Sequence, residues 1–508
     1  MVVRPPAGEG LSETPIQRDR AKTIFERSAP GRRAAVIPEL DVPETSIDEL
    51  LPEHLRRAQP AELPEVSEPE IVRHYNRLSR RNFDLDSGLY PLGSCTMKHN
   101  PRLNERVAAL PGHARLHPAQ RTAGAQGALA LMWELERALV EICGLPHVSL
   151  QPSAGSHGEL AGLLLTRAYH AGRGEEDQRI EVLTPDTAHG TNPASVTMAG
   201  YELVNVGTNE RGGVDLDELA ERVSEKTACL MLTNPNTLGL FDENIEEITR
   251  VVRDTGGTLY YDGANLNAIM GQSRPGDMGF DIVHVNLHKS FSQPHGGGGP
   301  GAGPIAVSDR IEPFLPIPRI TRSGDSFDLE TDYPKSIGRL RGFQGNFGVF
   351  VRAYAYILSL GGDGLAEASE TAVLNANYLL AKLRKGRAGR YAPLAFDRRC
   401  MHEFVLSGRP AKNELGVTTL DIAKRLLDYG FHPPTIYFPL LVDEAMMVEP
   451  TETEPRENLD AFAEAIEEIL AEAEEDPELL KRAPYTTPVR RLDEARAARR
   501  NPVLRQPL

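Results

Sequence analysis

The sequence predicts an α/β fold in which helices enclose a mostly parallel sheet, with a smaller C-terminal α+β domain after it. Short apolar segments alternate with helix-length segments between residues 120 and 310. Several of these segments end in turns with polar or small side chains, as strands do at a binding site. The 508-residue length suggests two or three domains. We expect an N-terminal arm over 1–83, a large domain over 84–345 and a small domain over 346–508.

The N-terminal arm is rich in proline and charged residues, which break up any long element. A short helix is predicted over 46–55, where Ser46 is suited to the N-cap. Two interpretations remain open for the arm as a whole. It lies extended on a surface, such as that of a partner, or it is disordered.

The large domain is predicted from its alternating pattern. A helix is expected over 129–142, because its leucines recur on one helical face. The predicted strands are 180–184, 201–206, 229–233, 258–262, 282–285 and 305–307. They are short apolar runs, which is typical of strands buried on both faces of a parallel sheet.

A helix predicted over 345–360 leads into the small domain, and the C-terminal part of the chain contains two segments of opposite charge. Residues 443–478 contain 15 acidic residues and one basic residue, Arg456. Apolar residues from Leu459 to Leu470 recur there at helical spacing, with Pro455 in the first turn, so the acidic residues are expected on a solvated helix face. The tail over 481–508 has a net charge of +6, and it folds back on its own chain or binds a partner.

Composition excludes several classes of function. Lys and Arg total 56 and Asp and Glu total 72, so the net charge of −16 argues against nucleic-acid binding. We expect no membrane span and no secretory signal, because no apolar stretch is long enough and the first ten residues lack an apolar core. The four cysteines form no CxxC pair. This predicts no metal site and a reducing, cytoplasmic compartment.

The first chemical signal is a run of small residues, Ser153-Ala-Gly-Ser-His-Gly-Glu159, before a predicted helix over 160–170. Small residues at the start of a helix leave backbone N–H groups free to bind an anion, which the helix dipole also favours. The run lacks the Lys-Ser/Thr ending of a nucleotide P-loop. An ordinary helix N-terminus is the simpler explanation of this segment taken alone.

Four more strand-end segments carry polar groups. They are 186–193 with His189, 233–239 with asparagines and threonines, 260–265 with Asp262, and 285–291 with Lys289. A carboxylate that ends an apolar strand needs a cationic partner, and a lysine in a low-dielectric site can act as an amine nucleophile. An anion-binding turn, a strand-end Asp262 and then Lys289 is the order expected for pyridoxal phosphate. That cofactor needs a phosphate anchor, a carboxylate on its pyridine nitrogen and a lysine that forms a Schiff base.

The glycine run at 296–301 formally matches GxGxxG. A dinucleotide fingerprint precedes a helix, whereas this run precedes a predicted strand. We interpret these glycines as allowing the backbone to turn tightly beside Lys289.

Longer motifs identify a family. The sequence resembles the P-proteins of the glycine cleavage system in DLDSGLYPLGSCTMKHNP (84–101), AHGTNPAS (188–195), DGANLNA (262–268), NLHKSFSQPHGGGGPGAGP (286–304) and FPLLVDEAMMVEPTETE (438–454). The resemblance covers nearly the whole chain. The length of the chain matches the second subunit of the split form of these enzymes, in which two homologous polypeptides share what is one long chain elsewhere. It implies a fold-type-I pyridoxal-phosphate domain and decarboxylation of glycine. It also implies transfer of the aminomethyl group to the lipoyl arm of H-protein, in an α2β2 assembly with subunit 1.

The resemblance also implies roles for individual residues. Lys289 should form the Schiff base, Asp262 should pair with the pyridinium nitrogen, and His189 should lie against the ring. The expected cofactor-binding set is completed by Gly155, Ser156, His157, Thr191, Ala264 and His288. Thr96 is expected on the substrate side.

Two alternatives remain. Another pyridoxal-phosphate decarboxylase or a cysteine desulfurase would share this site, and a desulfurase would need a mobile nucleophile such as Cys95. A noncatalytic scaffold subunit is a different class of function. The intact Asp262 and Lys289 argue against a scaffold.

Overall fold

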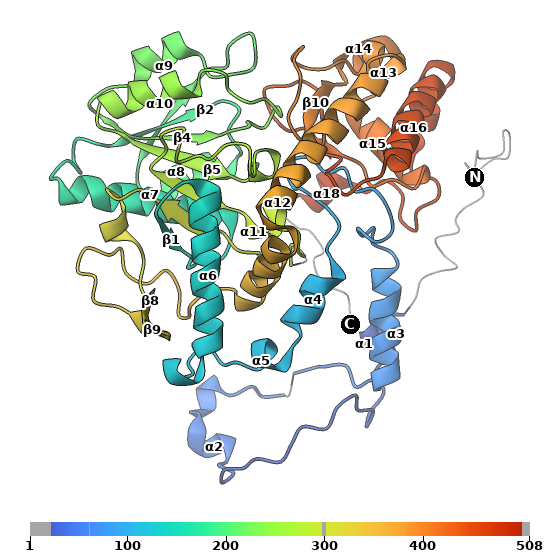
Figure 1. Ribbon diagram of the computed structural model, residues 1–508. Helices are drawn as coiled ribbons and strands as arrows, with labels where there is room; N and C mark the ends of the chain where they lie inside the picture. Colours follow the sequence, from blue (N-terminus) through green and yellow to red (C-terminus); the bar gives the residue numbers. More distant parts are fainter. Residues whose placement is uncertain (1–21, 60, 297–300, 500–508) are drawn as a thin grey trace. The chain divides into compact units, whose positions relative to one another are not determined.

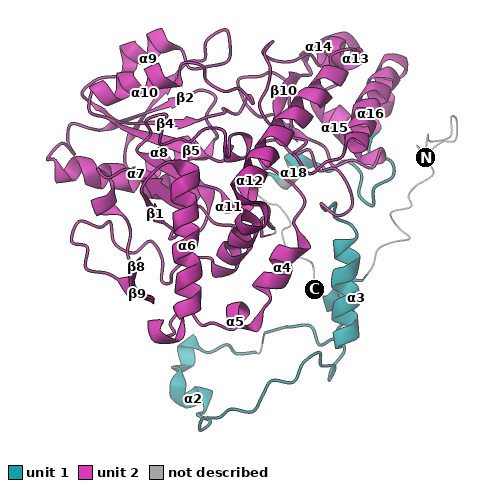
Figure 2. Cartoon of the chain, viewed as in Figure 1, with its two compact units in different colours: residues 1–84, 483–508 teal, residues 85–482 magenta. Residues whose placement is uncertain are grey.

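The computed structural model describes residues 22–59, 61–296 and 301–499. By its internal contacts the chain divides into two compact units, residues 1–84 with 483–508 and residues 85–482 (Figure 2). The predictions for the first ten residues, for most of the glycine run and for the end of the basic tail therefore lie outside the described residues.

The unit of residues 85–482 is built on a seven-stranded sheet of order β1-β7-β6-β5-β4-β2-β3 (Figure 1). The strands are β1 His147–Ser149, β2 Glu181–Pro185, β3 Glu202–Val206, β4 Thr227–Thr233, β5 Thr258–Gly263, β6 Ile282–Val285 and β7 Ile305–Val307. β3, β2, β4, β5 and β6 pair in parallel, whereas β7 runs antiparallel to β6 and β1. The predicted α/β fold with a mostly parallel sheet is confirmed.

Helices cover both faces of this sheet. One face carries α7 (Gly155–Gly172) and α8 (Thr191–Met198), and the other carries α6 (Gln126–Cys143), α9 (Leu216–Arg222) and α10 (Ile245–Asp254). Successive residues of a strand point to opposite faces. Tyr260 accordingly joins the core under α7, while Tyr261 joins the core under α6 and α10. This explains why the central strands are apolar at most positions.

Two details of the sheet differ from the sequence prediction. β1 was not predicted, because its three residues are too short to show a pattern. β3 is not buried on both faces, since four of its five residues are exposed or half-buried. β3 is an edge strand, and an edge strand has a neighbour on one side only.

The remaining elements of this unit before residue 347 connect and flank the sheet. They are α4 Arg102–Ala108, α5 Pro111–Ala114, η3 Thr122–Gly124, η4 Leu266–Ala268, α11 Leu287–Ser290, η5 Glu312–Phe314, β8 Arg319–Ser323 and β9 Ser326–Glu330. β8 and β9 form a separate antiparallel hairpin.

A long helix, α12 (Phe347–Leu383), leads to the C-terminal part and bends at Gly361, whose φ is +65°. Beyond it lies a three-stranded antiparallel sheet of β10 (Phe404–Ser407), β12 (Ala445–Val448) and β11 (Thr435–Ile436). The helices of this part are α13 Arg387–Tyr391, α14 Arg409–Leu415, α15 Thr419–Asp428, α16 Arg456–Glu475 and α17 Pro477–Arg482. Their apolar faces and that of α12 share one core.

The acidic segment forms α16 as predicted, and its apolar residues from Leu459 to Leu470 are buried. Pro455 is the N-cap rather than part of the first turn. The prediction of a solvated acidic face is wrong for three residues: Glu444, Glu449 and Glu472 are each at most 9% exposed. Each accepts hydrogen bonds from the protein, which offsets the cost of burial.

Arg425 on α15 pairs with Glu472 on α16 at 2.8 Å and with Asp428 at 3.0 Å, and all three side chains are buried. Replacing Arg425 with Met should destabilise the fold by about 3–5 kcal/mol, because the variant leaves buried carboxylates without their cation. The change is measured by thermal or urea unfolding. The matched control is Arg390→Met, which breaks an exposed pair with Glu414 and should have little effect. Equal stability of the two variants would contradict the prediction.

Glu136 on α6 is only 7% exposed, and burial raises its pKa from 4.5 to about 8, with Arg137 offsetting part of the effect. The folded chain therefore binds more protons here than the unfolded chain between pH 4.5 and 8. This contribution to stability is complete below pH 4.5 and is lost as pH rises through 8. Glu136→Gln should gain stability relative to the parent by up to about 1.4 kcal/mol per pH unit over that interval. Unfolding measured at pH 5 and pH 8.5 checks this, and a pH-independent difference would count against it.

The unit of residues 1–84 and 483–508 contains α1 (Ile24–Arg27), α2 (Ile47–Leu50), η2 (Glu53–Leu55), α3 (Glu68–Ser79) and α18 (Glu494–Ala497). Ser46 is the N-cap of α2, as predicted, and accepts a hydrogen bond from the Asp48 N–H. Between α1 and α3 the chain is mostly irregular. Most of its large apolar side chains are exposed, with Ile37 at 88%, whereas Val66 is buried.

Candidate active site

A cavity of about 360 Å³ lies at the carboxyl ends of the parallel strands. Its walls are formed by Ser94, by Ala154, Gly155, Ser156 and Glu159, by His189 and Thr191, by Thr233 and Thr237, by Asp262, Ala264 and Asn265, and by Asn286, His288 and Lys289. Ligands bind at this edge of an open α/β sheet because the loops after the strands converge there. All five strand-end and turn segments singled out from sequence contribute to one cavity, through Ser156, His189, Thr233 and Thr237, Asp262 and Lys289.

The N-terminus of α7 opens into the cavity through Ala154, Gly155 and Ser156. No side chain in the described part of the chain caps this helix, so its first N–H groups are available to an anion. A Cβ at Gly155 would lie 2.4 Å from Oδ1 of Asn286. Glycine is therefore what allows the helix to start this close to the end of β6.

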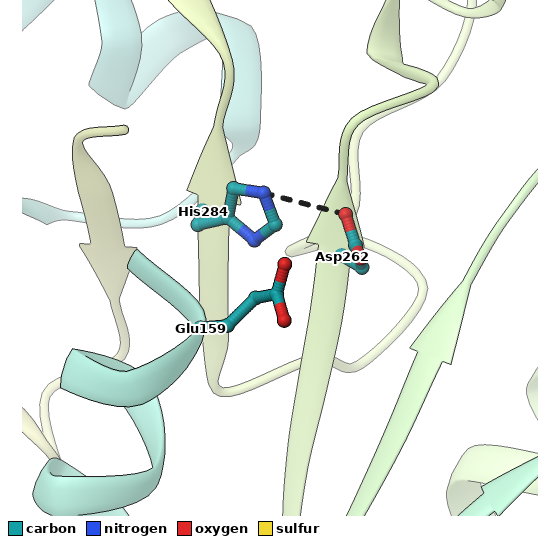
Figure 3. A group of neighbouring side chains, drawn as sticks. All are labelled: Glu159, Asp262 and His284. Carbon is teal, nitrogen blue, oxygen red and sulfur yellow. Dashed lines mark ion pairs between the residues drawn. The ribbon is translucent and has the colours of Figure 1, made fainter. Parts of the chain in front are cut away.

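Asp262 is the penultimate residue of β5 and is 2% exposed. Its carboxylate accepts hydrogen bonds from the Asn192 amide at 3.0 Å and from the Ala264 N–H at 2.9 Å. Nε2 of His284, its partner across the strands, lies 3.3 Å away (Figure 3). Burial opposes ionisation, but His284 and these hydrogen bonds outweigh it and hold the pKa of Asp262 below its ordinary value. The site therefore presents a buried carboxylate that is ionised at neutral pH.

Glu159 points from α7 toward the same group (Figure 3). Its carboxylate accepts hydrogen bonds from the Thr191 hydroxyl at 2.8 Å and the Ser195 hydroxyl at 3.2 Å. Oxygen and nitrogen atoms of Glu159, Asp262 and His284 lie within 4.8 Å of one another, a spacing that metal sites also use. Here both carboxylates are already held by hydrogen-bond donors of the protein, which makes them part of the wall of the cavity.

His189 follows β2 and is exposed to the cavity. Its Nδ1 lies 2.8 Å from the Thr191 hydroxyl and 3.2 Å from the Thr191 N–H, so Thr191 orients the ring. Desolvation, and then the nearby Lys289 charge, lowers the pKa of His189. A neutral imidazole with a fixed orientation is suited to stacking on an aromatic ring.

Lys289 lies on the single turn of α11, directly after β6, and is half-buried. Its Nζ donates a hydrogen bond to the Ser94 carbonyl at 2.8 Å. The neighbouring His288 also lines the cavity, and burial together with His295 and Lys289 lowers the pKa of His288 to about 3. An amine is thus held at the cavity wall among side chains that carry no competing positive charge.

The structure brings together eight of the nine residues expected from sequence: Lys289, Asp262, His189, Gly155, Ser156, Thr191, Ala264 and His288. It does not place His157 in the cavity wall. Nδ1 of His157 accepts the Ser153 N–H at 3.2 Å instead. Thr96, expected on the substrate side, is buried outside the wall, and its N–H donates to Glu449.

Sequence reasoning missed five polar residues of the site or its surroundings: Glu159, Asn192, His284, Glu403 and Glu449. Only weak signals pointed to them. His284 interrupts the apolar strand β6, and Glu449 directly follows the apolar strand β12. A charged or polar residue at such a position is costly to bury unless a partner faces it.

The residues present fit pyridoxal phosphate. The free N–H groups of α7 suit a phosphate, the ionised Asp262 suits a protonated ring nitrogen, and Lys289 is an amine within reach of the same cavity. Within the described residues Oδ1 of Asn286, at the cavity wall, has no hydrogen-bond partner. An unpaired buried acceptor at that position is consistent with a ligand that supplies a donor.

The sheet order and this strand-end cavity define the class: the chain has the α/β fold of the type-I pyridoxal-phosphate enzymes. Two solved structures with this fold are similar to it. A crystal structure of glycine decarboxylase (P-protein) of the glycine cleavage system, in inhibitor-bound form, matches with a TM-score of 0.70 and 22% identity over 84% of this chain and 95% of that chain. A cysteine desulfurase from Thermococcus onnurineus NA1 matches with a TM-score of 0.58 and 15% identity over 76% and 95%.

Sequence relatives are more specific. A relative from Caldanaerobacter subterraneus subsp. tengcongensis is 57% identical over 95% of this chain and 98% of its own length. One from Halalkalibacterium halodurans is 57% identical over 96% and 99%. The family model for the glycine dehydrogenase C-terminal domain matches residues 368–484. The chain belongs to the family of glycine dehydrogenase (decarboxylating) subunit 2.

No helix in the described ranges combines the length and the apolar character that a membrane crossing requires.

Proposed function

We propose that this chain is the lysine-bearing subunit of a pyridoxal-phosphate-dependent glycine decarboxylase that passes the aminomethyl group to the lipoyl arm of H-protein. The observation that carries the proposal is the cavity itself. It joins the ionised Asp262, the amine of Lys289 and the open N-terminus of α7. The names of the relatives and the expected P-protein motifs supply the reaction.

When bound, pyridoxal phosphate supplies an electron sink that accepts the electron pair left on Cα as carbon dioxide departs. The chain's own groups prepare this step. Gly155 and Ser156 hold the phosphate through their N–H groups, with Ala264 and His288 closing the wall on the Asp262 and Lys289 sides. Asp262 keeps the ring nitrogen protonated, because its carboxylate is ionised and buried.

Lys289 and His189 act at the reacting end. Lys289 is the amine that would attach the cofactor covalently. His189, oriented by Thr191, would pack against the cofactor ring. In place of the phosphate contact that the resemblance implies, Nδ1 of His157 accepts the Ser153 N–H, and this hydrogen bond shapes the turn before α7.

We further propose that the chain works with subunit 1 in an α2β2 assembly in the cytoplasm. The family name denotes one of two subunits. The cysteines Cys95, Cys143, Cys229 and Cys400 are all free, which fits a reducing compartment.

The desulfurase alternative depends on Cys95. Burial raises the pKa of the Cys95 thiol, although the Lys289 charge offsets part of the effect. A nucleophilic cysteine needs the opposite shift, since the thiolate is the reactive form. Cys95 also does not line the cavity. These observations favour decarboxylation.

The test is reconstitution of the full chain with pyridoxal phosphate, alone and with subunit 1, followed by borohydride reduction and peptide mapping. The expected result is a reduced adduct on Lys289, and then exchange of labelled carbon dioxide into glycine that depends on H-protein. An adduct without exchange, accompanied by persulfide on Cys95 after incubation with cysteine, would support the desulfurase. The absence of any adduct in both preparations would support the scaffold alternative.

A further inference from the structure

Three buried ionisable side chains, His402, Glu403 and Glu449, form a cluster beside the active site. His402 and Glu403 directly precede β10, and Glu449 directly follows β12. Their exposed fractions are 0%, 0% and 1%. Nε2 of His402 lies 3.8 Å from Oε1 of each glutamate. Burying such groups costs free energy, so their contacts indicate what they stabilise.

The two glutamates hold the turn of residues 94–96. Oε2 of Glu403 accepts the Ser94 N–H at 2.7 Å, and Oε2 of Glu449 accepts the N–H groups of Cys95 at 3.2 Å and Thr96 at 2.8 Å. Ser94 and Thr96 have φ values of +63° and +50°, in the left-handed region that side chains disfavour. The turn persists in this conformation because carboxylates accept all three of its N–H groups.

This turn contacts the catalytic lysine. The Ser94 carbonyl accepts the hydrogen bond from Nζ of Lys289. Oε1 of Glu403 accepts the amide of Asn265 at 3.2 Å, and Asn265 lies in the loop that follows Asp262. Glu403 therefore joins the turn that holds the lysine to the loop that follows the carboxylate.

The cluster cannot carry two negative charges at low cost. Burial, and then the neighbouring Glu449, raises the pKa of Glu403 well above its ordinary value, and burial also raises the pKa of Glu449. The other ionisable groups that face the pair are Lys289, His402, Cys95, Cys400 and Glu452. Burial and the Lys289 charge lower the pKa of His402 to about 3, so His402 is neutral and does not balance a second carboxylate.

Geometry locates the proton. Each oxygen of Glu403 already accepts an N–H donor, so a proton on either oxygen would weaken one of these hydrogen bonds. Among the described residues, Oε1 of Glu449 and both ring nitrogens of His402 have no hydrogen-bond partner. A proton on Oε1 of Glu449 would point toward the imidazole without facing another donor.

We propose that Glu403 and Glu449 are positioning residues that share one proton, held on Oε1 of Glu449, and that they fix the 94–96 turn so that the Ser94 carbonyl holds the amine of Lys289 whenever that amine is free. The proposal deepens the proposed function, since it takes Lys289 as the reacting amine. The pair does not touch the substrate. It holds the amine of Lys289 in position after glycine displaces it, so that the amine can react again.

The first test is amide hydrogen exchange of the full chain without cofactor, read on peptides that contain residues 94–96. Glu403→Gln should speed exchange at Ser94, because one of its two accepting oxygens becomes an NH2 group that faces a donor. Glu449→Gln should leave the protection of Cys95 and Thr96 unchanged, because its NH2 group can occupy the unpartnered Oε1 position. Glu403→Asp, which keeps the charge but shortens the side chain, should show the same loosening as Glu403→Gln and serves if that variant fails to fold. The matched control is Glu136→Gln, which alters a remote buried carboxyl and should not change exchange here.

The second test measures the protonation of Glu449 and the reactivity of the Lys289 amine directly. The infrared band of protonated carboxyl groups should lose intensity in Glu449→Gln, and Glu136→Gln calibrates the loss for one buried acid. The rate at which Lys289 forms its borohydride-trapped adduct should fall about 10- to 100-fold in Glu403→Gln, as expected for a displaced reacting group. Faster exchange at Cys95 and Thr96 in Glu449→Gln, or an unchanged carboxyl band, would overturn the shared proton. Unchanged exchange at Ser94 in both Glu403 variants would overturn the positioning role. The amide hydrogen-exchange experiment needs no cofactor, so it tests the positioning role even if the parent chain forms no adduct on Lys289 and the proposed function is wrong.

Discussion

Replacing Lys289 with alanine is expected to abolish covalent attachment of pyridoxal phosphate and to reduce glycine decarboxylation by more than about 10²-fold. The variant loses the amine that is proposed to attach the cofactor and to be displaced by glycine. It should still fold, because the Lys289 side chain is half-buried and its hydrogen bond runs to the Ser94 carbonyl. The measurement is borohydride trapping with peptide mapping, followed by carbon dioxide exchange with H-protein and subunit 1.

Two further variants serve as controls. One keeps the positive charge at residue 289 without a reactive amine, and the other removes a lysine elsewhere in the chain. Lys289→Arg keeps a positive charge near Asp262 and His189 but is not expected to form the covalent link, because guanidinium stays protonated. It should be as inactive as the alanine variant. Lys335→Ala removes an exposed lysine and should behave like the parent chain. Carbon dioxide exchange at the parent rate in Lys289→Ala would refute the assignment of Lys289 as the reacting amine.

Replacing Asp262 with asparagine is expected to slow decarboxylation by about 10²- to 10³-fold, the range seen when one preorganised electrostatic contact is lost. The neutral amide no longer stabilises a protonated ring nitrogen, so the cofactor becomes a weaker electron sink. The adduct on Lys289 should still form, since Lys289 is unchanged. Because the pKa of Asp262 lies below its ordinary value, the carboxylate stays ionised above pH 5, and the loss should be constant from pH 6 to 8.

The matched control is Asp281→Asn. Asp281 is also buried, and it accepts hydrogen bonds from Arg310 at 2.6 Å and from the Leu259 N–H at 2.9 Å, but it does not line the cavity. This variant should lose stability, by roughly 1.5–3 kcal/mol, while the folded fraction keeps its decarboxylation rate. If Asp262→Asn decarboxylates glycine at the parent rate, the role of Asp262 at the ring nitrogen is wrong.

The features that sequence predicted well are local ones. All six predicted strands are present, and all but β3 are mostly apolar runs whose length and flanking turns identify a buried strand. Asp262 and Lys289 stood out because Asp262 closes such a run and Lys289 lies in the turn after one, and the carboxyl ends of parallel strands meet at one edge of a sheet. The edge strand β3 was misjudged because strand order is not encoded in a local pattern.

The family motifs and the strand-end residues are thus determined by the sequence itself, including the lysine proposed to form the Schiff base, the carboxylate proposed to face the ring nitrogen and the small residues that start α7. The tertiary structure decided which distant groups surround them. His284 meets Asp262 only through the register of β5 and β6, and His157 turns away from the cavity to Ser153. Glu403 and Glu449 reach the 94–96 turn across more than 300 residues of sequence. A glutamate in an acidic stretch has the same composition whether it is solvated or buried, and only packing against donors from elsewhere in the chain makes its burial affordable.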